Sequence, residues 1–409
     1  MARWLAILPL LLGAAPDGSA EAVPPRAKAE DGVLAIKNAR VITISGAEIE
    51  GGTVLVRAGR IEAVGKDVEI PWDAKTIDAT GKVLMPGLIE AHTFRGMDRP
   101  NERMASVPFV SAFDAVNPVD PYFEDALRQG ITTLLVAPGN DTLIGGQACV
   151  MKPWGATTER MLVAKNAFLK ISLKPRAGMS RMAHVAALRR ELDEAAEGAK
   201  EPKDGPPSEA AAKREPLGRL LKGALPAFVY CPTASDALKA MELAETYKFR
   251  PVLVLGRDGW KAAEEIAKRK LDVVLASELA YWETDEEKHE EVRRIGATPF
   301  AKADVRFAFQ TDGSPYGGAY LWYQAATAVK HGMSRADALR AITLAPAEIL
   351  GLGARMGSIE KGKDANLTLL TGDPLDVQTW VDRVLIDGQT AYERSKDERL
   401  KRVLPETKK

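Results

Sequence analysis

The chain has 409 residues, of which 46% are hydrophobic. This is enough for a large buried core, in two or three domains or in one large barrel with an appendage. The 56 basic and 56 acidic side chains give a formal net charge of zero. This balance, without a basic block, gives no electrostatic footprint for nucleic acid, and the hydrophobic fraction excludes a wholly disordered chain.

The first 20 residues have the pattern of an export signal. Arg3 precedes an apolar stretch from Trp4 to Leu12, and Gly18-Ser19-Ala20 is a candidate cleavage site. The stretch is shorter than the roughly 20 apolar residues of a membrane-spanning helix, with an N-terminal anchor as the alternative. We expect a signal peptide over 1–20 and a secreted or periplasmic protein without a membrane span. Cys149 and Cys231 both lie in apolar runs, and their pairing stays open.

Short β-prone runs punctuated by glycine occupy both ends of the chain. They extend from Val33 to Ile77 and return from Ala365 to Ile386, where Asp387-Gly388 is typical of a hairpin turn. Between these ends, apolar runs alternate with helical patterns, which indicates βα units. The apolar runs are Leu88–His92, Ile131–Val136, Phe168–Leu173, Ala227–Cys231, Val252–Leu255, Val273–Ala276 and Val305–Phe309.

Seven such strands, with a doubtful eighth at Ala148–Lys152, predict an α/β fold with a (β/α)8 barrel. The eighth is doubtful because it follows its predecessor too closely for a crossover helix. A doubly wound sheet is the alternative, but no glycine-rich phosphate turn follows the first strand. Ser334 and Asp337 predict a helix start, and residues 191–215 predict an exposed helix and loop.

Two motifs carry a resemblance to a known family. The run Val83-Leu84-Met85-Pro86-Gly87-Leu88-Ile89-Glu90-Ala91-His92-Thr93-Phe94 resembles the first barrel strand of the amidohydrolase superfamily, in particular its imidazolonepropionase-like branch. The run Met356–Asn366 is similar to that branch's return from barrel to sandwich. The resemblance implies a metal-dependent barrel over 85–352 and a small composite β-sandwich over 31–84 and 353–395. It also implies hydrolysis of non-peptide C–N bonds, in cyclic amides or imidazolone-like compounds, with zinc as the cofactor.

Only part of the implied metal site survives. His92 and Asp312 stand at ligand positions, and Asp312 also stands where the family has its catalytic base. Lys170 matches a bridging lysine that binuclear members carry, with Lys152 as a weaker candidate. Three positions that hold histidine in the family are occupied here by Phe94, Tyr230 and Leu255. Because zinc needs several imidazole and carboxylate ligands in a compact geometry, we expect its binding to be weak or lost.

The other histidines are expected to be structural. His184 falls in a helical stretch, His289 on a charged, solvated helix face, and His331 near a helix end. None of them ends an expected barrel strand, which is where ligands project in such barrels.

Three hypotheses for function remain. The chain is an inactive member of the family, kept for binding or for pairing with a related active chain. Alternatively, it is a mononuclear hydrolase in which Asp312 is the base, His92 a metal ligand and Lys170 a further ligand. In the third, it is a non-catalytic barrel that binds a small molecule through Tyr230, Tyr316, Tyr320 and Trp322. A homo-oligomer is compatible with each of them.

Overall fold

The structure is a computed structural model. It describes residues 32–197, 209–285, 287, 289–312 and 320–403. The expected signal peptide and Tyr316 therefore lie outside the described residues. Within them, no helix combines the length and apolar character that crossing a membrane requires.

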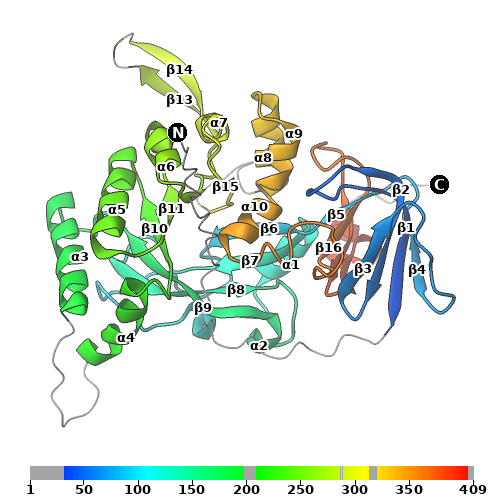
Figure 1. The fold of residues 1–409 in the computed structure, drawn as a ribbon, viewed down its shortest axis with the longest axis horizontal. Coiled ribbons are helices and arrows are strands. Elements are labelled where there is room, and N and C mark those ends of the chain that lie inside the picture. Colours follow the sequence, from blue (N-terminus) through cyan, green and yellow to red (C-terminus); the bar gives the residue numbers. More distant parts are fainter. Residues whose placement is uncertain (1–31, 198–208, 286, 288, 313–319, 404–409) are drawn as a thin grey trace, which may run out of the picture.

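Strands from both ends of the chain share one sheet (Figure 1). Its centre is β5 (Val83–Pro86), which pairs with β1 (Val33–Val41) on one side and with β16 (Leu367–Leu370) on the other. The order is β18-β17-β16-β5-β1-β2-β3, with β4 paired to β1. The other strands are β2 (Ile49–Arg57), β3 (Arg60–Gly65), β4 (Lys75–Asp78), β17 (Val381–Ile386) and β18 (Gln389–Glu393).

The predicted hairpin turn joins β17 to β18. Asp387 and Gly388 have φ of 49° and 75°, the left-handed backbone that a tight two-residue turn requires at both positions. An apolar core that includes Ile36, Val54 and Leu367 unites strands from the two chain ends. The β-rich domain is therefore composite, as the resemblance implied.

A second eight-stranded sheet curls into a nearly closed barrel, which confirms the predicted fold class. The order is β6-β7-β8-β9-β10-β11-β12-β15. Its strands are β6 (Leu88–Thr93), β7 (Ile131–Val136), β8 (Ile144–Met151), β9 (Leu162–Ser172), β10 (Ala227–Cys231), β11 (Pro251–Leu255), β12 (Asp272–Val274) and β15 (Phe307–Ala308). Ala341 and Ile342 bridge the last gap, because their carbonyls accept from Phe309 N and Ile89 N at 3.2 and 2.9 Å.

The doubtful eighth strand is real, but it runs the other way. β8 is antiparallel to both β7 and β9, whereas the other paired neighbours in the barrel are parallel. The link from Val136 to Ile144 is too short for the crossover that a parallel neighbour would need, about a dozen residues. One unit of the ideal (β/α)8 pattern is thus replaced by a hairpin.

Helices cover the outside of the barrel (Figure 1). The described ones are α1 (Pro121–Arg128), α2 (Thr158–Met161), α3 (Arg181–Ala196), α4 (Glu209–Leu221), α5 (Ala234–Tyr247), α6 (Ala263–Lys268), α7 (Thr298–Lys302), α8 (Leu321–Lys330), α9 (Arg335–Arg340), α10 (Leu344–Ile349) and α11 (Glu398–Val403). The expected start of α9 is confirmed, because Ser334 caps it by accepting from Asp337 N.

One helix prediction is wrong. The charged segment that contains His289 forms a hairpin, β13 (Ala280–Asp285) with β14 (Glu290–Ile295), which projects from the barrel (Figure 1). His289 lies at its turn with φ of 55°. Cross-strand pairs such as Glu283–Arg294 stabilise the hairpin. The charged residues that suggested a solvated helix face therefore lie on two paired strands.

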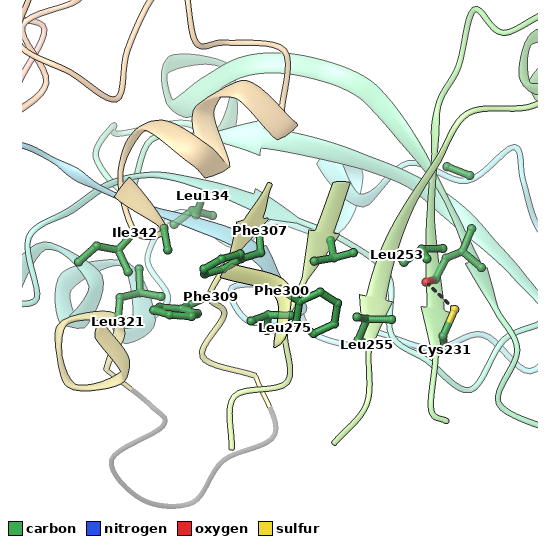
Figure 2. Packing of buried hydrophobic residues seen from close by; sticks show 14 of the residues in the cluster. Leu134, Cys231, Leu253, Leu255, Leu275, Phe300, Phe307, Phe309, Leu321 and Ile342 are labelled. Carbon is green, nitrogen blue, oxygen red and sulfur yellow. Dashed lines mark hydrogen bonds between the residues drawn. The ribbon is translucent and has the colours of Figure 1, made fainter. Parts of the chain in front are cut away.

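Two apolar layers alternate across the barrel strands. Phe168, Phe228 and Val254 belong to the inner layer. The outer layer lies between strands and helices, and Figure 2 shows part of it, including Leu253, Leu255, Phe307 and Phe309. Because side chains of a strand alternate between its two faces, this layering decides which sequence positions line the barrel interior.

Candidate active site

A β-bulge in the first barrel strand turns His92 inward. Between the pairs Glu90–Leu134 and Thr93–Val136, β6 advances three residues while β7 advances two. Such an extra residue redirects side chains at functional sites. The imidazole lies parallel to the Phe228 ring of the inner layer, with centroids 6.2 Å apart. Gly87, just before this strand, packs directly against Thr132. A Cβ at position 87 would lie 2.1 Å from Thr132 Oγ1, so only glycine fits there.

The contacts of His92 define which ring nitrogen carries hydrogen. Gln310 Nε2 donates to Leu275 O at 3.0 Å, so Gln310 Oε1 faces His92 Nδ1 as an acceptor at 3.0 Å. Nδ1 therefore carries the hydrogen, and Nε2 accepts from Lys170 Nζ at 2.6 Å. Burial and the nearby lysine charge lower the pKa of His92 well below its ordinary value, so the ring is neutral.

Lys170 reaches this point from β9 and has no exposed surface. Burial lowers its pKa to about 7, which the attraction of Asp312 only partly opposes. The Tyr230 ring from β10 lies on another side of the amine, with Nζ 5.8 Å from the ring centroid. A lysine without solvent and beside a neutral imidazole loses its proton far more readily than a surface lysine.

Asp312 follows the last barrel strand and is held by the end of the first. Its Oδ1 accepts from Thr93 Oγ1 at 2.9 Å, and its Oδ2 accepts from Phe94 N at 2.8 Å. Oδ2 also lies 3.6 Å from His92 Nδ1. Burial raises the pKa of Asp312 to about 6, although these donors act to lower it.

Glu90 is a site residue that the sequence analysis did not single out. It is fully buried, and its carboxyl group accepts from Thr311 N at 3.1 Å and from His92 N at 3.4 Å. Burial, followed by the charge of Asp312, raises its pKa to about 8. A carboxylate in a fully buried strand was the available signal, because such a group is rarely buried unless it is paired.

The structure brings His92, Lys170 and Asp312 together at the barrel interior, as the resemblance implied. Phe94 is also there, but it contributes its backbone N–H to Asp312. Leu255 is not: it lies in the outer layer (Figure 2). Its neighbour Val254 belongs to the inner layer. The expected match of Leu255 to a ligand position is therefore wrong, because its side chain points away from the barrel interior.

The weaker lysine candidate lies elsewhere. Lys152 forms an ion pair with Asp387 Oδ2 at 2.5 Å, which ties the barrel to the composite sheet. His184 is buried and donates from Nε2 to Ser172 O at 2.8 Å, while His331 ends α8. Cys149 and Cys231 are both buried and free. These five residues have structural surroundings.

The residues at this site do not fit the zinc ion that the family resemblance implies. Lys170 uses the imidazole lone pair that would bind a metal, and hydrogen bonds engage both oxygens of Asp312. In the described part of the chain, no group of three or more His, Cys, Asp or Glu side chains is arranged to hold a metal. The arrangement is a buried hydrogen-bonded network rather than a coordination shell.

Comparison with known proteins agrees with this architecture. The family model described as "Amidohydrolase family" matches residues 249–391. A crystal structure of an amidohydrolase from Thermotoga maritima MSB8 is 30% identical with a TM-score of 0.78, over 88% of this chain and 100% of that one. The chain therefore belongs to the amidohydrolase superfamily.

Curated relatives share shorter or more distant stretches. Amidohydrolase tasK of Hapsidospora irregularis is 23% identical over 84% of this chain. An imidazolonepropionase of Vibrio cholerae is 29% identical over 25% of this chain. The matches span 40% of the first relative and 33% of the second. These partial matches agree with the family but do not assign a reaction to this chain.

Proposed function

We propose that this chain is an amidohydrolase-family barrel that has lost metal-dependent turnover and is kept to bind a small molecule or a related active chain. The reaction class that family membership supports is hydrolysis of C–N bonds other than peptide bonds. The observation that carries the proposal is the 2.6 Å contact between Lys170 Nζ and His92 Nε2, which leaves no imidazole lone pair for a cation.

Magnitudes support this proposal. Loss of one partner that merely orients a metal ligand typically costs about 10–100-fold in affinity or activity. Here Phe94 and Tyr230 stand at two expected ligand positions, and the face of β11 at Leu255 carries no replacement. Aromatic and aliphatic groups also make the site drier, which raises the cost of placing a divalent charge there.

Elemental analysis of the full chain, purified from zinc-supplemented medium, tests the proposal. We expect well below one equivalent of any transition metal, and the same content in His92→Ala. Thermal unfolding should be unchanged by a chelator, because no metal contributes to folding. Near-stoichiometric metal that disappears in His92→Ala would overturn the proposal.

A mononuclear hydrolase is the second candidate, and one observation favours it. Three buried groups at the site have displaced pKa values: Asp312 at about 6, Lys170 at about 7 and Glu90 at about 8. Such clusters are typical of catalytic sites, where a base must titrate near neutral pH. In this reading Asp312 is the general base, and His92 and Lys170 are the ligands.

The two candidates differ in a measurable way. Hydrolysis of hydantoin, imidazolone or N-acyl-amino-acid substrates with added metal, lost in Asp312→Asn, would establish the second. The absence of turnover across this panel supports the first. Export to the periplasm or beyond, directed by residues 1–20, is part of the proposal, and fractionation of tagged full-length protein tests it.

A further inference from the structure

A cavity of about 570 Å³ lies between the barrel and the composite sheet. Barrel elements supply one side of it through Leu88 at the start of β6, Ile342, and the end of α1. The composite sheet supplies the other through Leu370 of β16 and the segment that leads into β17. Boundaries between domains are a common position for small-molecule sites, and this volume suits a small ligand.

Aromatic side chains form much of the wall. Tyr320 and Trp322, at the start of α8, have ring centroids 6.1 Å apart. Trp380 lies just before β17. The Arg394 guanidinium packs over its ring, with Arg394 Cζ 4.4 Å from the ring centroid. Tyr320 and Trp380 remain 44% and 41% exposed, so part of their ring surface is free to cover a flat ligand.

The charges that line the cavity favour an anion. Three arginines line it against two aspartates, Asp125 and Asp376. Asp125 is neutralised by Arg128 and Arg399 at 2.9 and 3.0 Å. Arg95 is stacked on the Tyr122 ring at 4.4 Å, and among the described residues no carboxylate pairs with its guanidinium. One arginine is therefore left for a ligand carboxylate, which it can bind through two parallel hydrogen bonds.

We propose that this cavity is a binding site for a small aromatic monoanion. The aromatic wall covers the ring, and Arg95 binds the carboxylate. The charge of Arg95 also acts to lower the pKa of Asp312, so the cavity lies next to the buried cluster around His92.

Two matched probes test the contribution of the charge in isothermal titration calorimetry with the full chain. Indole-3-acetate has the ring and the charge, and indole-3-acetamide has the ring without the charge. We expect indole-3-acetate to bind about tenfold more tightly than indole-3-acetamide, the equivalent of one hydrogen bond to the protein.

Variants assign the loss to the residues. Arg95→Gln should weaken the binding of indole-3-acetate about tenfold and leave the binding of indole-3-acetamide unchanged. Arg160→Gln is the control, because Arg160 is also an exposed arginine but does not line the cavity. Equal binding of acid and amide to the unaltered protein, no binding at millimolar probe, or equal effects of the two arginine substitutions would overturn the proposal.

Discussion

Replacing Lys170 with methionine should increase stability, and more so at low pH. The substitution keeps an unbranched chain of similar length but removes an amine that has no exposed surface. The hydrogen bond from Nζ to His92 Nε2 is lost, which leaves that nitrogen without its donor. This loss costs about 1–3 kcal/mol at every pH at which the imidazole is neutral.

The gain depends on pH because burial lowers the lysine pKa from 10.5 to about 7. Below pH 7 the folded protein holds a buried cation, and the displacement corresponds to about 5 kcal/mol at 1.36 kcal/mol per unit. Between pH 7 and 10.5 the unfolded chain binds the proton and the folded protein does not. The stability of the unaltered protein therefore rises with pH in this range, whereas the Lys170 contribution is absent from the variant.

Chemical denaturation at pH 6 and pH 9 measures the effect. The stability difference between Lys170→Met and the unaltered protein should shrink by about 3 kcal/mol from pH 6 to pH 9, the two units above the folded pKa. Lys222→Met, at an exposed lysine, should show no such change. The same difference at both pH values, or one that grows with pH, would refute the assignment of a buried, proton-releasing amine.

Three further perturbations have defined outcomes. The pKa of Glu90 is raised to about 8, so the stability of the unaltered protein falls as pH rises from about 4.5 to 8. In denaturant titrations, the stability of Glu90→Gln relative to the unaltered protein should therefore be higher at pH 9 than at pH 5. Leu255→Ala should cost about 2–5 kcal/mol in the same assay and leave metal content unchanged, since the side chain fills the outer layer. Lys152→Met should cost about 1–2 kcal/mol in thermal unfolding, because the half-buried Asp387 loses a buried partner; an unchanged midpoint would show that the pair contributes nothing.

Much of the candidate site was predictable because it is carried by local sequence. His92 lies in a strand that is recognisable from Pro86, Gly87 and the apolar residues after them. Asp312 lies just after the last apolar run. Glu90 was visible but was treated as part of the motif. Gln310 could not be found, because its importance comes from its orientation by Leu275 O, a contact between two different strands.

Two predictions failed because equal patterns permit different structures. The charged run around His289 suits a solvated helix face, but it also suits a hairpin whose strands pair opposite charges. Leu255 was matched to a ligand position by the family resemblance, and a one-residue difference moves a side chain to the other face of a strand.

The amino-acid sequence by itself determined the alternation of strands and helices, the composite β-rich ends and the loss of histidine at the expected ligand positions. These are properties of residue type and spacing, which act over a few turns or strands. Only the tertiary structure decided that Lys170 donates to His92. This contact joins residues that are 78 positions apart in the chain, and burial, which sets the charge of Lys170, exists only once the barrel has closed around it.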